Sequence, residues 1–147
     1  LCDLDPELIK LANKECLLSS TYEPSSKTKM KLRAAPGAGT MYLQSECAEA
    51  LAELFAGAEE AGYKLYLKSA YRAYKTQKTM YNNRLERNNG KDDGWVSKPG
   101  ASDHQTGLGC DVVPGSWKDK SMNSNMASTP ECQWMAEHCD EYGFVIR

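Results

Sequence analysis

The 147 residues are about the length of one domain, and 41% of them are hydrophobic, which is sufficient for a core of moderate size. Eighteen Lys and Arg residues nearly balance twenty Asp and Glu residues, and no basic block indicates a nucleic-acid partner. No apolar run approaches the length of a membrane-spanning helix, and the N-terminus lacks the basic start and apolar core of a signal peptide.

The chain contains six cysteines, an even number that is high for this length and favours an oxidising compartment with some disulfides. They are Cys2, Cys16, Cys47, Cys110, Cys132 and Cys139. No C-x-x-C pair occurs, which argues against a zinc ribbon or a thioredoxin-type redox site. The alternative is buried free thiols, because cysteine packs as a small apolar residue.

The N-terminal part of the chain predicts a short helix followed by an irregular segment. Within residues 3–18, Asp3 or Asp5 is a suitable N-cap, and the apolar residues recur at near-helical spacing until about Asn13. Residues 19–40 are rich in Ser, Thr, Lys, Pro and Gly. A loop of this length in a small domain usually covers the surface or lines a site.

The strongest helix signal lies in residues 44–61, where one apolar stripe repeats at helical spacing. The stripe consists of Ala48, Leu51, Ala52, Leu54, Phe55 and Ala58. Ser45 is a suitable N-cap, and Gly62 stands where a glycine commonly ends a helix. The alternating residues 63–68 then predict a strand.

A second, polar helix is expected over residues 74–88, where an Asn-Asn-Gly run ends it. Its inward side is expected to consist of Met80, Tyr81 and Leu85. Residues 91–101 then form a loop that Trp95 and Val96 are expected to anchor.

The C-terminal part of the chain predicts a short strand over residues 110–113, a loop, and a helix over residues 130–142 that Thr129 caps. Residues 144–147 begin another strand. The chain shows no repeat and no linker, and its helices and strands do not alternate regularly. This pattern predicts a single α+β domain.

Arg72 follows the end of the strand predicted over residues 63–68, and Gln77 lies in the first turns of the next helix. Functional residues often stand at strand ends, because the scaffold holds them rigidly. An arginine there can hold a carboxylate through two parallel hydrogen bonds. The alternative is a surface arginine in an ordinary ion pair.

His104 and Asp111 form a candidate metal pair, seven residues apart with two glycines between them. Imidazole and carboxylate both bind zinc, and glycines allow the backbone to turn sharply between them. The alternative is a loop histidine and a strand-capping aspartate. Cys110 should face away from Asp111, since neighbours on a strand point to opposite faces. His138, inside the last helix, has no second ligand at an obvious spacing.

Two motifs in this order resemble the zinc D-alanyl-D-alanine carboxypeptidases related to the VanY type. Ser69-Ala70-Tyr71-Arg72 followed by Gln77 is similar to their S-x-Y-R-x-x-x-x-Q element. The run from Ser102 through His104 to Asp111 resembles their S-x-H-x-x-G-x-A-x-D metal motif. Residues 13–24 and 131–147 also resemble the family, so the similarity extends over nearly the whole chain.

The resemblance implies a hedgehog/D,D-peptidase-like fold, in which helices pack on a small antiparallel sheet. It implies that His104 and Asp111 bind zinc, and that Arg72, with Gln77 and Ser102, holds the substrate carboxylate or the developing oxyanion. Arg72 is therefore the candidate catalytic residue. The implied reaction removes a terminal D-Ala from a peptidoglycan stem peptide by metal-activated water. The implied location is extracytoplasmic, in the cell wall or secreted.

The chain departs from the family pattern at two points. Gly109 stands where the family usually has alanine. The family's third zinc ligand, a histidine, and its glutamate base lie in an E-P-W-H element beyond a strand such as residues 144–147, and this chain contains no such element. We therefore expect residues 1–147 to be one peptidase-like domain that is incomplete at its C-terminus.

Three explanations account for the missing element. The favoured one is a truncated version of an active peptidase, completed by a C-terminal segment not present here. The second is completion by another chain. The third is a non-catalytic cell-wall or peptide-binding module of the same fold. A disulfide-stabilised structural domain without metal is a further alternative.

Overall fold

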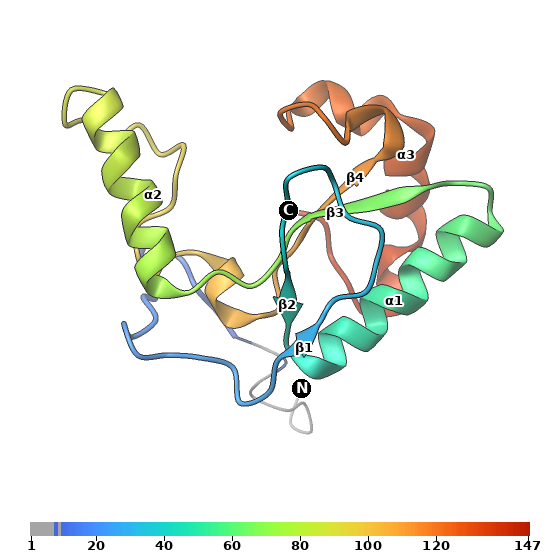
Figure 1. Ribbon diagram of the computed structural model, residues 1–147, viewed down its shortest axis with the longest axis horizontal. Coiled ribbons are helices and arrows are strands. Elements are labelled where there is room, and N and C mark those ends of the chain that lie inside the picture. The colour runs from blue at the N-terminus through green and yellow to red at the C-terminus, as the bar shows by residue number, and fades with distance from the viewer. Residues whose placement is uncertain (1–7, 9) are drawn as a thin grey trace.

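The computed structural model describes residue 8 and residues 10–147, and within them it has the predicted α+β architecture (Figure 1). The helices and strands are β1 (Thr28–Lys29), β2 (Tyr42–Leu43), α1 (Ser45–Glu60), β3 (Leu65–Ser69), α2 (Tyr74–Arg87), β4 (Asp111–Pro114) and α3 (Pro130–His138). Short 3₁₀ turns are Asp103–Thr106, Gly115–Trp117, Ser124–Ser128 and Cys139–Tyr142. None of the described helices is both long and apolar enough to cross a membrane.

Helix α1 forms as the apolar stripe predicts and provides one side of the core. Its buried side chains are Cys47, Ala48, Leu51, Leu54, Phe55 and Ala58, whereas Ala52 faces solvent. The cap is Gln44 instead of Ser45, because the Gln44 carboxamide accepts from Cys47 N at 3.0 Å while Ser45 Oγ accepts from Thr28. Gly62 ends the helix with φ +88°, a conformation that costs glycine little.

The strands form two antiparallel pairs, β1 with β2 and β3 with β4. In the second pair Leu67 lies opposite Val112, and the register slips so that Ser69 lies opposite Asp111. Leu65, Leu67 and Val113 are almost fully buried beneath α1 and α3. This buried face holds the end of β3 and the start of β4 against each other, where the sequence placed its candidate residues.

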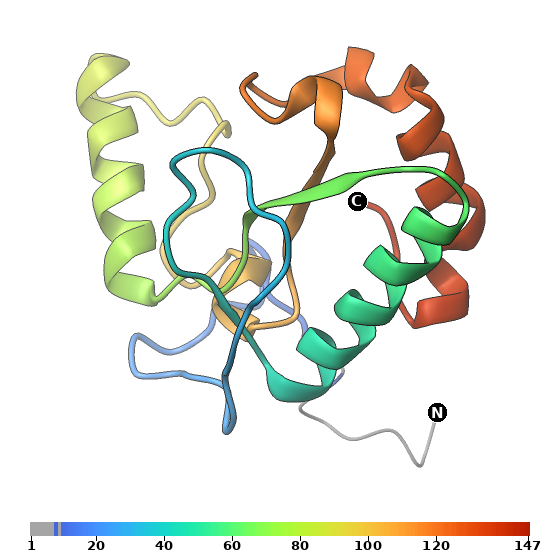
Figure 2. The same ribbon diagram turned by 45° about the vertical axis from the view of Figure 1, so that its right-hand side comes forward.

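Helix α2 and the loop after it project from the body as an arm, as both ribbon views show (Figures 1 and 2). Gln77 is the buried residue of α2. The prediction that Met80, Tyr81 and Leu85 form an inward side is therefore wrong: Met80 is 38% exposed and the other two are half-buried. Too few apolar residues lie on one face of this helix to pack it onto the core.

The two ends of the chain differ from their predictions. The helix predicted within residues 3–18 lies partly outside the described residues, and residues 10–18 are not helical. Asn13 there accepts from the amides of Glu15 and Cys16, a local turn that competes with a helix. Residues 144–147 form no strand, because their backbone pairs with no described strand.

The five described cysteines, which are Cys16, Cys47, Cys110, Cys132 and Cys139, are all free thiols, and Cys2 lies outside the described residues. The expectation of disulfides is therefore not met within this part of the chain. Cys47, Cys132 and Cys139 are buried in the core. Burial raises the pKa of the Cys47 thiol to about 11 and that of Cys110 to about 12, so these groups are unreactive.

We expect a Gly57→Ala substitution to destabilise the fold by about 1–3 kcal/mol through overpacking. A Cβ atom at Gly57 would lie 2.0 Å from the Tyr142 hydroxyl and 2.9 Å from its Cζ atom. Chemical denaturation measures the free energy of unfolding. Tyr142→Phe in the same background should recover part of the loss. A Gly57→Ala variant as stable as the parent would show that α1 and the 3₁₀ turn do not pack this closely.

Candidate active site

The site begins where β3 ends beside the start of β4. Because the register slips between Leu67 and Ser69, the Ser69 hydroxyl faces Asp111 and donates a hydrogen bond to Asp111 Oδ2. Cys110 packs against the core while Asp111 lines an open cleft, as the alternation of a strand predicts. The strand pair thus fixes the position of one carboxylate in the cleft.

His104 reaches the same place from the 3₁₀ turn that precedes β4. Its Nδ1 atom lies 2.7 Å from the carbonyl oxygen of Ala70, and its Nε2 atom lies 3.4 Å from Asp111 Oδ2. A backbone carbonyl only accepts, so Nδ1 carries the proton in this contact and Nε2 is the nitrogen that points into the cleft. The side chain is 13% exposed. This is the orientation that a metal-binding histidine usually has.

Arg72 is joined to the same turn by its backbone, since its N–H donates to the His104 carbonyl at 3.0 Å. Its guanidinium donates to Gln77 Oε1 at 2.9 Å, and the Gln77 amide donates to the Ser97 carbonyl at 2.7 Å. Gln77 is 1% exposed, so it holds a fixed orientation. Within residues 10–147 the bond to Gln77 is the hydrogen bond that the guanidinium makes, and its other N–H groups could donate to a ligand.

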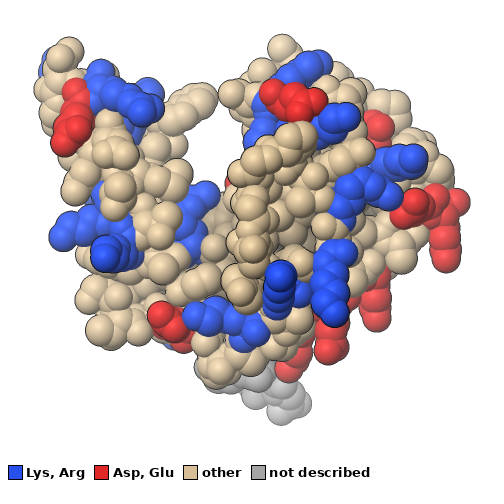
Figure 3. Space-filling view, in the orientation of Figure 1, with Lys and Arg blue, Asp and Glu red and all other residues tan. Residues whose placement is uncertain are grey.

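The structure brings together all five residues predicted from the sequence. Arg72, Gln77, Ser102, His104 and Asp111 line one cleft of about 260 Å³. The other lining residues are Met80, Trp95, Val96, Ser97 and Asp103. The space-filling view shows an open notch between the arm and the body of the molecule (Figure 3). An imidazole, a carboxylate and a guanidinium therefore face one shared space.

The sequence motifs did not identify every residue that supports this site. The Ala70 carbonyl, which orients His104, has no side-chain signal, and Ser69 was quoted in the motif without a role of its own. Met80 was expected to face inward and Trp95 to anchor a loop, yet both line the cleft.

The two central side chains shift each other's pKa in opposite directions. Burial acts to lower the pKa of His104, but its hydrogen bonds to Asp111 and to the Ala70 carbonyl prevail and hold the pKa above its ordinary value of 6.5. Burial acts to raise the pKa of Asp111, but the bonds from His104 and Ser69 hold it below 3.8. At neutral pH the carboxylate is thus ionised, and the imidazole retains its proton to a higher pH than a free histidine does.

These shifts predict a pH-dependent metal affinity. A metal ion needs the neutral imidazole, so binding must displace a proton at any pH below the raised pKa of His104. We expect the apparent zinc affinity of the full-length protein to rise about tenfold per pH unit up to that pKa and to level off above it. In the metal-free protein the same shift stabilises the fold below pH 6.5, and this stabilisation is lost as pH rises through the folded-state pKa.

Competition with a chelator of known affinity, repeated between about pH 5.5 and 8.5, measures this profile. The His138→Ala variant is the control and should give the same curve. Zinc affinity that does not change over this interval would contradict the role of His104.

The donor set fits two positions of a zinc site. One imidazole nitrogen and one carboxylate oxygen converge on the cleft, and each side chain is oriented by a further hydrogen bond. Within the described part of the chain, no group of three His, Cys, Asp or Glu side chains is placed to hold a metal ion. The His138 ring stacks on that of Trp134 with centroids 4.9 Å apart, and its Nδ1 atom lies 3.0 Å from Glu141 Oε1. It therefore does not join His104 and Asp111.

Two glycines permit the turn between His104 and Asp111. Gly107 has φ +74°, and a Cβ atom there would lie 3.0 Å from Pro24 Cγ and 3.2 Å from the Gln44 nitrogen. At Gly109 a Cβ atom would lie 3.1 Å from the Asp103 carbonyl carbon. Alanine at this second position, the usual residue in the resembled family, would require a small movement of the turn that carries His104.

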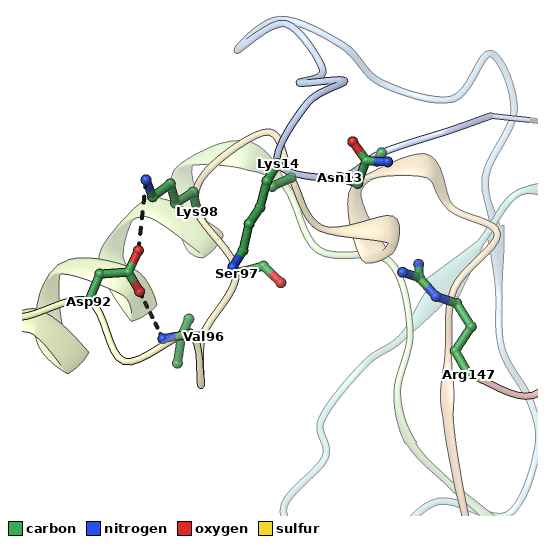
Figure 4. A pocket seen from close by; sticks show the side chains of 10 residues that line it. Asn13, Lys14, Asp92, Val96, Ser97, Lys98 and Arg147 are labelled. Carbon is green, nitrogen blue, oxygen red and sulfur yellow. Dashed lines mark hydrogen bonds and ion pairs between the residues drawn. The ribbon is translucent and has the colours of Figure 1, made fainter.

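A second hollow of about 230 Å³ adjoins the cleft, because Val96 and Ser97 line both spaces. Lys14 and Lys98 lie near Asp92 in this hollow, with Arg147 further along it (Figure 4). The Lys98 Nζ atom lies 3.8 Å from Asp92 Oδ2. This hollow contains none of the five predicted residues.

A protein-family model described as D-alanyl-D-alanine carboxypeptidase, VanY, matches residues 40–147. The chain is also 33% identical over 147 residues to YodJ of Bacillus subtilis (strain 168), a protein provisionally named as a carboxypeptidase. This match covers 97% of the chain and 54% of YodJ, so the chain spans about half the length of this curated relative.

Solved structures share the fold over nearly the whole chain. The LdcB LD-carboxypeptidase is 33% identical with a TM-score of 0.87, over 97% of this chain and 68% of that one. DacB from Streptococcus pneumoniae D39 is 28% identical with a TM-score of 0.66, over 93% of this chain and 63% of that one. A zinc complex of the D,D-pentapeptidase VanY is 20% identical with a TM-score of 0.64, over 96% of this chain and 76% of that one. The fold is thus the hedgehog/D,D-peptidase-like one that the sequence motifs implied.

Proposed function

Because the chain belongs to the D-alanyl-D-alanine carboxypeptidase family of the VanY type, we propose that it is a zinc-dependent carboxypeptidase that removes a terminal D-Ala from peptidoglycan stem peptides. The observation that carries this proposal is the shared cleft of His104, Asp111, Arg72 and Gln77. In it an imidazole and a carboxylate lie near a guanidinium that, among the described residues, donates to Gln77 and has further N–H groups that a carboxylate could accept from. A carboxypeptidase needs both features close together, since the bond it cuts is next to the terminal carboxylate.

In this proposal each residue has a separate task. His104 and Asp111 hold the zinc, whose chemistry when bound is to polarise a carbonyl and to acidify water. Arg72 binds the terminal carboxylate or the developing oxyanion, and Gln77 keeps its guanidinium in place. Ser102, which is 5% exposed in the cleft wall, adds a hydroxyl for the same group. A third ligand and a general base are assigned to a segment outside these 147 residues.

The second candidate specificity is that of an L,D-carboxypeptidase. LdcB and DacB are named as LD-carboxypeptidases and are 33% and 28% identical to the chain. A D,D-carboxypeptidase removes D-Ala from a preceding D-Ala, whereas an L,D-carboxypeptidase removes it from a preceding L-residue. Both reactions release the same D-Ala and need the same carboxylate contact. The proposed residues therefore serve either one.

We also propose that residues 1–147 form one peptidase-like domain and that it acts outside the cytoplasm, because its proposed substrate is cell-wall peptide. A peptide-binding module without activity is the alternative from another functional class.

The test incubates the full-length protein with synthetic stem peptides that end in D-Ala-D-Ala or in L-residue-D-Ala. Release of D-Ala is measured by mass spectrometry, before and after a chelator and again after zinc is restored. We expect zinc-dependent release from one of the two peptides, and the preferred one decides the specificity. Peptide binding without any release, in protein that retains zinc, would support the binding module and reject the carboxypeptidase.

A further inference from the structure

The wall of the cleft beside Arg72 and Gln77 is apolar, although it belongs to a polar arm. Met80 lies one helical turn beyond Gln77 on α2, and Trp95 and Val96 directly precede Ser97, whose carbonyl accepts from Gln77. Met80 is 38% exposed and Trp95 is 76% exposed. Large apolar side chains left in water beside a site usually contact a ligand.

Hydrogen bonds back to α2 hold the loop that carries Trp95. Asp92 accepts from Gly94 N at 2.9 Å and from the Tyr81 hydroxyl at 3.1 Å. Asp93 accepts from Trp95 N at 3.2 Å and from the Arg84 guanidinium.

Arg84 also lies over the Trp95 ring, 6.0 Å from its centroid. The backbone at Trp95 is therefore held against α2, and the Arg84 guanidinium covers part of the exposed indole.

From this arrangement we propose that Met80, Trp95 and Val96 form a subsite for the side chain of the substrate's last residue and limit its size. The inference rests on the proposed function, in which Arg72 holds the terminal carboxylate. The side chain of that residue branches from the carbon that bears the carboxylate, so it must lie beside Arg72. The apolar wall of the arm lines the same cleft as Arg72 and the metal pair, so it is available to this side chain.

The size of the cleft leads to a definite selectivity. A volume of about 260 Å³ must accept the scissile peptide group together with this side chain, and Trp95 and Met80 are the large apolar residues that line it. In this proposal a methyl group leaves Trp95 in place, whereas a branched side chain needs space that Trp95 borders. Since one methylene changes selectivity about 10- to 200-fold in an apolar pocket, a single tryptophan can decide between these residues.

The test compares peptides that differ only in the last residue, D-Ala or D-Leu, in the full-length protein and in Trp95→Ala. We expect the kcat/KM ratio of D-Leu to D-Ala to rise at least about tenfold in Trp95→Ala, and to rise less in Met80→Ala. Trp95→Phe should give an intermediate ratio, because phenylalanine keeps an aromatic ring but is smaller than tryptophan. The control is Trp117→Ala, which removes the same ring outside the cleft.

Zinc content should equal that of the parent in every variant, because the hydrogen bonds that orient His104 and Asp111 come from Ala70, Ser69 and each other. A Trp95→Ala variant that still releases D-Ala with an unchanged ratio overturns the subsite. Failure of the parent protein to release D-Ala from any peptide overturns the proposed function, and the subsite with it.

Discussion

A His104→Ala variant of the full-length protein is expected to contain no zinc above background and to release no D-Ala. Loss of a residue that only orients a zinc ligand costs about 10- to 100-fold in affinity, so loss of the ligand itself should cost more than about 100-fold. Elemental analysis of the purified protein measures the metal content. Turnover of the preferred stem peptide is measured on the same sample.

Two further variants separate metal loss from misfolding. His138→Ala removes the other histidine, which is exposed on α3, and should retain both zinc and activity. His104→Gln retains a side-chain amide that can donate to the Ala70 carbonyl, so its fold should survive while its zinc is lost. Parent levels of zinc in His104→Ala would show that His104 is not a ligand.

An Arg72→Ala variant should keep its zinc and lose turnover. Removing a donor that stabilises developing charge costs about 10²- to 10³-fold in kcat, and loss of the carboxylate contact should also raise KM. Steady-state kinetics and metal analysis on one preparation measure both effects. Arg72→Lys is expected to recover little, because an ammonium group cannot form two parallel hydrogen bonds to a carboxylate.

Arg87→Ala is the matched control, since it removes an arginine from the exposed end of α2. It should leave kcat and KM unchanged. Parent-level activity in Arg72→Ala would mean that the substrate carboxylate is held elsewhere.

Local sequence signals predicted α1, α2 and the start of α3 correctly, because the backbone groups of a helix find their hydrogen-bond partners within a few residues. The apolar stripe predicted α1 to within one residue at each end, and Thr129 caps α3 as its pattern indicated. The strand over residues 144–147 was wrong because a strand also needs a partner, which local sequence does not reveal. The inward face assigned to α2 was wrong for a related reason: Met80 lines a cleft instead of a core, and Tyr81 and Leu85 are only half-buried.

The candidate site was also predicted in part: residue type and spacing are local signals, whereas contacts with distant backbone groups are not. Spacing and residue type identified His104 and Asp111, and the structure places their polar atoms 3.4 Å apart. The role of the Ala70 carbonyl could not be predicted, because every residue carries such a group and only pairing geometry selects one. Trp95 was noticed as an apolar residue in a polar loop, but its side of the cleft depends on how that loop folds back onto α2.

The few buried contacts of α2 affect how a product could leave the cleft. Gln77 is the buried residue of α2, and its amide links Arg72 to the Ser97 carbonyl. Segments with few buried contacts open at a small free-energy cost. An opening of the arm would separate Gln77 from the guanidinium, and in the proposed function the product carboxylate would then lose its partner in the same event. The strand pair that carries Asp111 need not move at all, so release of the cleaved residue and rigidity of the metal pair are compatible in one small domain.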